Sequence, residues 1–208
     1  MARPALRSLV LASGSQARLR LLRDAGLDPE VVVSGADESN DDGIDTRALV
    51  GSLAERKAAA VAALRPDALV LGCDSMLDLD GTALGKPASA LEAIWMWRRL
   101  AGREGTLYTG HRLIDARAGR QAGAVAATIV RFGTPTAAEI EDYVATGEPL
   151  QLAGAFSIDG RGAPFVDGIV GDPGNVIGLS LPLLRRLLAE LDIAITDLWR
   201  PPGAPALQ

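Results

Sequence analysis

Short apolar runs alternate with helical patterns in the first third of the chain. Residues 8–12, 30–34 and 68–73 centre on hydrophobic side chains and are each followed by a polar or glycine residue, which is typical of buried strands. Between these runs, Ser15 is placed to cap a helix with leucines on one face, and Thr46 to cap an alanine-rich helix that stops before a proline. This alternation predicts an α/β fold.

Hairpins replace this alternation after residue 74. Asp80-Gly81 is a strong signal for a two-residue hairpin turn, and the runs 106–115 and 121–132 are expected to pair antiparallel. Two capping boxes predict further helices: Ser89 with Glu92, and Thr136 with Glu139. We expect three more elements toward the C-terminus: a strand at 163–170, a turn at Asp172-Pro173-Gly174 and a helix at 183–191.

Composition narrows the class of protein. With 208 residues and 48% hydrophobic content, the chain suits one sizeable domain or two lobes that share a core. The net charge of −5 gives no electrostatic reason to expect nucleic acid or an anionic membrane as partner. The single cysteine excludes a disulfide framework within the chain, and no apolar run is long enough to span a bilayer, so we expect a cytoplasmic location.

The segment from Leu9 to Arg18 is predicted to form a strand, a tight loop and the start of a helix. A helix N-terminus presents unpaired N–H groups and a positive dipole end, and Ser13, Ser15 and Arg18 add donors and charge. The segment therefore predicts an anion site. An ordinary helix cap with a solvated arginine explains the spacing equally well.

Acidic residues follow the other two predicted strands. Asp74 comes directly after an apolar run, at the point where open α/β sheets bind ligands. It can bind a divalent cation, accept a proton from attacking water, or simply form a turn. Glu38 or Asp37 would supply a second oxygen ligand for Mg²⁺, which takes one or two carboxylates together with substrate phosphates.

Two lysines are candidate phosphate ligands, and the sequence supports Lys86 better than Lys57. Lys86 lies between Gly85 and Pro87, which restricts its backbone, although a solvated loop lysine is the alternative. The segment does not match a Walker-type phosphate loop, because proline follows the lysine. Lys57 stands in a run of charges on a helix, which is more typical of a solvated face.

Nucleophilic catalysis by cysteine or serine is not expected. Cys73 is interpreted as a core residue, and His111, the single histidine, as a strand residue without a catalytic role. The glycine-rich segment around Phe156 and Asp159 is of a different kind. It permits close approach of the backbone to a flat ligand, and Asp159 could accept hydrogen bonds from the edge of a nucleobase.

Together these motifs resemble the Maf family of nucleoside triphosphate pyrophosphatases. The matching blocks occur in the family's order over nearly the whole chain: Leu11-Ala12-Ser13-x-Ser15-x-x-Arg18, Glu38, Glu55-Arg56-Lys57-Ala58, Asp74-Ser75, Gly85-Lys86-Pro87, Tyr108-Thr109-Gly110, Tyr143 to Leu150, Ala153 to Phe156 and Asn175 to Leu179. The resemblance implies an elongated mixed sheet with flanking helices and two lobes around a central cleft, related to the inosine triphosphate pyrophosphatases, and a possible homodimer.

The resemblance also implies an activity, which is hydrolysis of a nucleoside triphosphate to the monophosphate and pyrophosphate with Mg²⁺ or Mn²⁺, removing non-standard or excess nucleotides. Asp74 would accept the proton of the attacking water and, with Glu38, hold the metal. The implied substrate-binding residues are Ser13, Ser15, Arg18, Lys57, Ser75, Lys86 and Asp159. Residues 1–200 would form the domain, with 201–208 as a disordered tail.

The sequence departs from the family pattern at two places. The family usually has Pro-Arg where this chain has Gln16-Ala17, and pyrimidine-preferring members carry glutamine at the position of Asp159. A carboxylate has acceptors only, so the base preference stays open between dTTP or UTP and a modified or purine nucleotide. Two other functions also stay open, a nucleotidyltransferase and a non-catalytic nucleotide-binding regulator of cell division.

Overall fold

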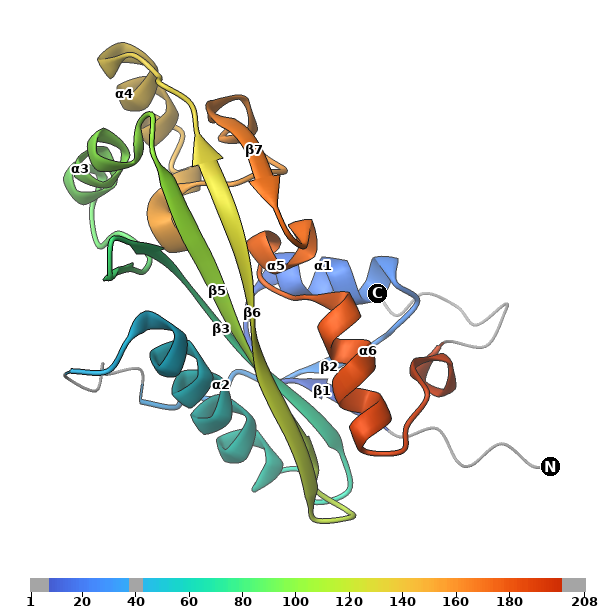
Figure 1. Ribbon diagram of the computed structural model, residues 1–208. Helices are drawn as coiled ribbons and strands as arrows, with labels where there is room; N and C mark the ends of the chain where they lie inside the picture. The colour runs from blue at the N-terminus through green and yellow to red at the C-terminus, as the bar shows by residue number, and fades with distance from the viewer. Residues whose placement is uncertain (1–7, 38–42, 200–208) are drawn as a thin grey trace.

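The computed structural model describes residues 8–37 and 43–199 and has an α/β fold with a mixed seven-stranded sheet (Figure 1). The strand order is β2-β1-β3-β5-β6-β7, with β4 also paired to β3. The strands are β1 (Leu9–Leu11), β2 (Glu30–Val31), β3 (Leu69–Leu79), β4 (Thr82–Leu84), β5 (Glu104–Asp115), β6 (Arg120–Phe132) and β7 (Val166–Val170). The helices are α1 (Gln16–Asp24), α2 (Thr46–Ala62), α3 (Ala90–Leu100), α4 (Ala137–Ala145), α5 (Pro173–Ile177) and α6 (Leu181–Glu190).

The central strand β3 is longer than the sequence predicts. We expected a strand that ends at Asp74 and a separate hairpin strand, but β3 runs without interruption to Leu79. The reason is that β5 pairs antiparallel with it from Leu69 to Asp78, so Asp74 and Ser75 are held in the sheet by backbone hydrogen bonds. Asp74 therefore lies in the middle of a strand.

The opposite edge of β3 is covered only in part. There, β1 pairs in parallel with Leu69–Leu71, and β4 pairs antiparallel with Leu77–Leu79 across the predicted Asp80-Gly81 turn. Within the described part of the chain, no strand pairs with this edge between residues 72 and 76. The loop that follows β1 and the segment that follows β4 thus flank an open stretch of β3.

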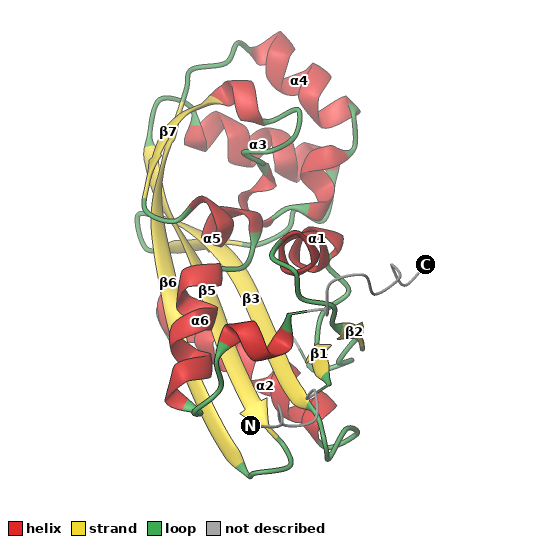
Figure 2. Ribbon diagram, turned by 90° about the vertical axis from the view of Figure 1, so that its right-hand side faces the viewer, coloured by secondary structure: helices red, strands yellow, loops and turns green. Residues whose placement is uncertain are grey.

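Glycines let helix α2 lie unusually close to the sheet. A Cβ atom at Gly72 of β3 would lie 2.3 Å from the carbonyl oxygen of Ala54, and one at Gly110 of β5 would lie 2.1 Å from that of Val50. Both contacts are shorter than any side chain permits. Helices α2 and α6 lie on opposite faces of the sheet (Figures 1 and 2). Because Gly72 contacts α2 and successive side chains of a strand point to opposite faces, the even-numbered residues of β3 face α2.

Two large hydrophobic clusters occupy the two ends of β3. One contains Leu71 and Cys73 together with leucines of α1 and α6, and the other contains Leu77, Leu79 and the aromatic side chains beside α3 and α4. Helices α3 and α4 lie with β7 at the same end of the sheet (Figure 2). Along β3, Asp74 and Ser75 therefore lie between the residues of the two clusters.

Other expectations differ in detail from the structure. The valine run at 30–34 gives only the short edge strand β2, and Val33 is 70% exposed, because β1 is its one strand neighbour among the described residues. Asp45, not Thr46, caps α2, since its side chain accepts the N–H of Ala48. Asp172 caps the short helix α5 where we expected a turn. The antiparallel β5–β6 pair and the Thr136 capping box are confirmed.

Candidate active site

The loop after β1 forms the predicted helix N-terminus. Ser15 is the N-cap of α1, and its hydroxyl accepts the N–H of Arg18 at 3.4 Å. The hydroxyl oxygen of Ser13 accepts the N–H of Ser15 at 3.2 Å. The strand, loop and helix expected from the sequence are therefore confirmed, and the cap and the candidate anion site turn out to be parts of one arrangement.

Arg18 is buried, with only 9% of its surface exposed. Its guanidinium donates three hydrogen bonds, from Nε to the carbonyl oxygen of Gly178 at 2.8 Å, from Nη1 to Ser13 Oγ at 3.0 Å and from Nη2 to Ser75 Oγ at 3.0 Å. The interpretation as a solvated arginine is wrong. These bonds leave two of the five guanidinium N–H groups for another ligand.

No carboxylate in the described part of the chain balances the positive charge of Arg18. Its three hydrogen-bond acceptors are neutral, and no described aspartate or glutamate forms an ion pair with it. A buried charge without a counter-charge is energetically costly. The arrangement is therefore suited to an anion that completes it.

Asp74 and Lys57 form a second, different arrangement on the face of β3 that carries α2. Lys57 Nζ donates to Asp74 Oδ1 at 2.5 Å, and only about a tenth of each side chain is exposed, 10% for Lys57 and 11% for Asp74. The close approach of α2 at Gly72 brings the two together. The charge run around Lys57 had indicated a solvated face, and the structure contradicts this for Lys57 itself.

Lys86 and Asp159 lie in loops outside these two arrangements. Lys86 is exposed just after β4, and the preceding carbonyl oxygen, that of Gly85, accepts the N–H of Gly154 at 2.9 Å. Asp159 forms an ion pair with Arg20 on α1. This pair joins the glycine-rich segment to the helix that begins at the Ser13 loop, and it occupies one oxygen of the carboxylate expected to face a base.

Glu148 organises that glycine-rich segment and was not identified from the sequence. Its carboxylate accepts the backbone N–H groups of Arg161 and Gly162, as well as the hydroxyls of Tyr143 and Ser157. Burial works to raise the pKa of Glu148, but these four hydrogen bonds outweigh it and lower the pKa. The glutamate therefore stays charged and holds the loop that bears Asp159.

Thr109 and Asn175 are two further buried polar residues, which stand in the family-like motif blocks but had no role assigned from the sequence. Thr109 is fully buried in β5, and its hydroxyl lies 3.0 Å from the carbonyl oxygen of Asn175 and 2.9 Å from the hydroxyl of Ser75. One signal was available, because Thr109, like His111, is a polar residue at an inward-facing position of β5 between Leu107 and Leu113. Asn175 lies in a short turn-like segment, where only its place in a family motif block marked it.

The structure supports the passive roles expected for Cys73 and His111. Cys73 is buried, and desolvation raises the pKa of its thiol to about 12, so it remains a thiol. Burial lowers the pKa of His111 to about 4, so the ring is neutral at pH 7. Its Nδ1 donates to the carbonyl oxygen of Thr109 at 3.0 Å, and its Nε2 accepts the N–H of Ser180 at 2.9 Å.

The metal-binding prediction can be examined at one of its two positions. Asp74 offers a carboxylate oxygen beyond the one bound to Lys57, and oxygen is the ligand type that Mg²⁺ takes. Glu38 lies outside the described residues. Among the described residues, no group of three potential ligands forms a metal cluster, but Mg²⁺ held largely by phosphates and water needs only one or two carboxylates. The donor chemistry fits the expected ion.

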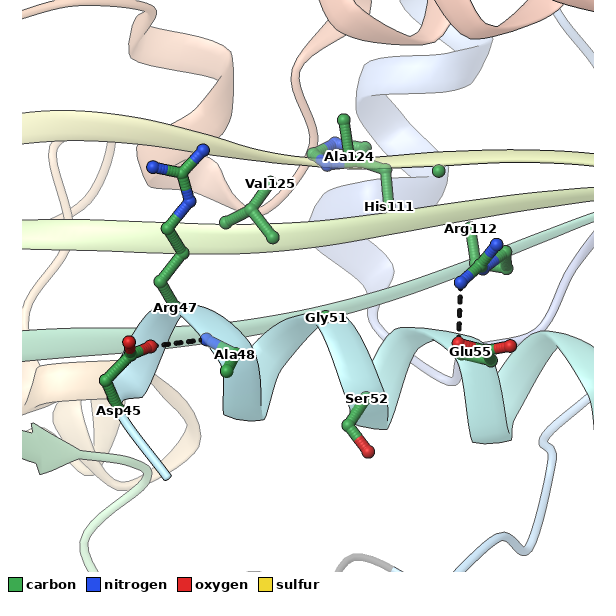
Figure 3. Close-up of a pocket in the computed structure, with 11 residues that line it drawn as sticks. Asp45, Arg47, Ala48, Gly51, Ser52, Glu55, His111, Arg112, Ala124 and Val125 are labelled. Carbon is green, nitrogen blue, oxygen red and sulfur yellow. Dashed lines mark hydrogen bonds and ion pairs between the residues drawn. The ribbon is translucent and has the colours of Figure 1, made fainter. Parts of the chain in front are cut away.

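A hollow lies elsewhere on the described part of the chain. A groove of about 380 Å³ runs between α2 and the β5–β6 pair, with Asp45, Arg47 and Arg112 among its lining residues (Figure 3). The ion pair between Arg112 and Glu55, at 2.5 Å, crosses it. None of the residues predicted to bind substrate or metal lines this groove, so it is not the predicted site.

None of the described helices is long and apolar enough to cross a membrane.

Comparison with known proteins places the chain among its relatives. The family model described as Maf-like protein matches residues 8–191. A protein of Streptomyces coelicolor named nucleoside triphosphate pyrophosphatase is 62% identical over 198 residues, which cover 94% of this chain and 96% of that protein. Proteins of the same name from Streptomyces avermitilis and Salinispora tropica are 60% and 56% identical, covering 94% and 92% of this chain and 96% and 87% of theirs.

These matches extend over both arrangements that flank β3 and over the helices that carry them. The family model alone spans Ser13, Arg18, Lys57, Asp74 and Lys86, together with most of the described chain. The resemblance inferred from the sequence motifs is confirmed, and the chain belongs to the Maf family.

Proposed function

We propose that the protein is a nucleoside triphosphate pyrophosphatase that hydrolyses its substrate to a nucleoside monophosphate and pyrophosphate. The observation that carries the proposal is the buried guanidinium of Arg18, which has no carboxylate partner among the described residues and lies across β3 from the Asp74–Lys57 pair. One side of the strand offers uncompensated positive charge, and the other offers a carboxylate. Relatives of the same family at 62% and 60% identity bear the name of this activity.

Phosphate binding is assigned to the Ser13 loop and its neighbours. Ser13 accepts two hydrogen bonds, so its own proton is available for a phosphate oxygen. Arg18 contributes its two remaining N–H groups and its charge. Lys86, exposed on the other side of the open stretch of β3, adds a positive charge that can meet the outer phosphates. These cations stabilise the negative charge that develops on departing pyrophosphate.

Asp74 is assigned the role of accepting the proton of the attacking water. Lys57 holds one carboxylate oxygen at 2.5 Å and so fixes the orientation of the group. The other oxygen accepts the proton as water attacks the α-phosphorus in line with the leaving pyrophosphate. The bond from the α-phosphorus to the bridging oxygen breaks, and the electron pair leaves with pyrophosphate.

A divalent cation, Mg²⁺ or Mn²⁺, is proposed as the cofactor. Asp74 and Glu38 would hold it, and a bound cation polarises the phosphoryl oxygens and neutralises charge on the triphosphate. The chemistry of the Asp74 oxygens supports this assignment. The proposal also includes one domain of two lobes over residues 1–200, which is supported by the two hydrophobic clusters that share β3. The resemblance supports a homodimer. The resemblance and the buried single cysteine support a cytoplasmic location.

Hydrolysis in ¹⁸O-labelled water tests the reaction. A panel of nucleoside triphosphates is incubated with Mg²⁺, and pyrophosphate and the position of the label are measured. We expect pyrophosphate from at least one nucleotide and ¹⁸O in the monophosphate, because water attacks the α-phosphorus. Label in pyrophosphate contradicts the proposed attack. Release only with an added acceptor indicates a nucleotidyltransferase, and binding without any release indicates a regulator.

A further inference from the structure

Thr109 stands behind the phosphate site without lining it. It is fully buried and pairs directly with Ser75 across β3 and β5. Its hydroxyl is 2.9 Å from Ser75 Oγ and 3.0 Å from the carbonyl oxygen of Asn175. Ser75 in turn lies 3.0 Å from Nη2 of Arg18. A continuous chain of hydrogen bonds thus joins Arg18 to the backbone of α5.

The chemistry of the end groups fixes the direction of every bond in this chain. A carbonyl oxygen can only accept, so the single hydroxyl proton of Thr109 goes to Asn175. The bond between the two hydroxyls must then be donated by Ser75. Arginine can only donate, so Ser75 accepts from Arg18. The order of donation is Arg18 to Ser75 to Thr109 to the carbonyl oxygen of Asn175.

This order changes the role expected for Ser75. Its proton is committed to Thr109, so it has only lone pairs to present toward a phosphate, and those repel phosphate oxygens. Ser13 differs, because both of its hydrogen bonds are accepted and its proton is uncommitted. Of the two serines bonded to Arg18, Ser13 is fit to donate to phosphate, and Ser75 is fit to orient the guanidinium.

The far end of the chain is rigidly anchored. The side-chain amide of Asn175, which is fully buried, donates at 3.1 Å to the carbonyl oxygen of Leu107 and at 3.1 Å to the hydroxyl of Thr128. Three residues later, the carbonyl oxygen of Gly178 accepts from Nε of Arg18 at 2.8 Å. The same short segment therefore holds Arg18 directly and through Thr109.

We infer that Thr109 is a positioning residue which, through Ser75, sets the plane of the Arg18 guanidinium for the triphosphate. The inference rests on the proposed function, because it assigns a residue to the same phosphate site. Hydrogen bonds to a charged group are stronger than neutral ones and depend on alignment. Loss of the relay should therefore weaken phosphate binding and leave the Asp74 chemistry on the other face of β3 intact.

The test replaces Thr109 by valine, which keeps the shape and removes the hydroxyl. We expect KM for the nucleotide and Kd for inorganic pyrophosphate to rise about tenfold, a change equal to roughly one charged hydrogen bond. The pH profile of kcat should not change. Thr109→Ser should restore the wild-type values. Thr106→Val is the matched control, because it makes the same change on the same strand away from Arg18.

Non-additivity separates a relay from a general packing effect. Ser75→Ala breaks the same chain, so the double variant with Thr109→Val should bind pyrophosphate no more weakly than either single variant. Losses that add, or unchanged pyrophosphate binding in Thr109→Val, overturn the inference. If Thr109→Val does not fold, Ser75→Ala and Thr109→Ser carry the comparison. Pyrophosphate binding is measured without turnover, so a wild-type protein that releases no pyrophosphate would refute the proposed function and still permit this test.

Discussion

The two faces of β3 hold charge in opposite ways. On the face toward α2, the charge of Asp74 is matched by Lys57 at 2.5 Å, so the pair is neutral as a whole. On the other face, the hydrogen-bond acceptors of Arg18 among the described residues are all neutral. A matched pair orients a carboxylate for proton transfer, whereas an unmatched buried cation favours an anionic ligand. The difference assigns chemistry to one face and binding to the other.

The largest effect is expected from breaking the chemistry face. Asp74→Asn keeps the shape but removes the proton acceptor, so turnover should fall about 10²-fold or more. Steady-state pyrophosphate release measures the loss, and circular dichroism checks the fold. Turnover close to that of the wild-type protein in a correctly folded variant would refute the role of Asp74.

Acid should lower the free energy of unfolding through His111. Burial holds its pKa at about 4, below the ordinary 6.5, so the neutral ring contributes stability that is complete above pH 6.5 and is lost as the pH falls toward 4. The loss reaches about 3 kcal/mol, since each pKa unit is worth roughly 1.4 kcal/mol. Urea unfolding at several pH values measures it.

The carboxylates also titrate in this range, so a variant is needed as reference. His111→Gln removes the titration and keeps a side-chain acceptor for the N–H of Ser180. The free energy of unfolding of this variant should fall less steeply between pH 6.5 and 4. Equal slopes would show that His111 does not contribute.

A smaller effect is expected from separating Lys57 from Asp74 by backbone displacement. Gly72→Ala places a Cβ 2.3 Å from the carbonyl oxygen of Ala54, so α2 must move outward. Overpacking of this kind costs about 1–3 kcal/mol of unfolding free energy. The midpoint temperature of thermal unfolding and the turnover rate should both decrease. Gly168→Ala serves as control because no atom lies within 4 Å of its Cβ position; equal effects of the two changes would contradict the close approach of α2.

The smallest stability effect belongs to the exposed ion pair of Asp159 with Arg20. Asp159→Gln should change the free energy of unfolding by less than about 1 kcal/mol, as exposed pairs do, while shifting base preference toward pyrimidines. The ranking of kcat/KM across nucleotides is the measurement. Arg20→Gln breaks the ion pair but keeps the Asp159 carboxylate, so it separates the effect of losing the pair from the effect of changing the group that is proposed to contact the base. An unchanged ranking in Asp159→Gln would show that this residue does not contact the base.

The sequence predicts the residue types of the site better than their surroundings. The cap at Ser15, the strand before it and the hairpin at Asp80-Gly81 follow from local rules, and the structure confirms them. The pairing of Asp74 with Lys57 depends on how closely α2 approaches β3, which only the packed structure determines. The same is true of Thr109, whose partners are 34 and 66 residues away along the chain.

One misprediction is informative about physical causes. Polar residues after an apolar run suggested that the strand ends at Asp74, yet pairing with β5 continues to Asp78. Backbone hydrogen bonds do not depend on side-chain polarity, so a strand can carry its functional residues in its middle. That placement puts neighbouring residues on opposite faces and so produces the two arrangements.

Titration of inorganic pyrophosphate into two variants tests this division most directly. The account predicts that, when the titration contains no divalent cation, Asp74→Asn binds pyrophosphate at least as tightly as the wild-type protein, because it loses a negative charge but no phosphate ligand. Arg18→Gln should bind it about tenfold more weakly or worse, because the unmatched cation is gone. Binding that is lost in Asp74→Asn and kept in Arg18→Gln would contradict the assignment of binding to one face and chemistry to the other.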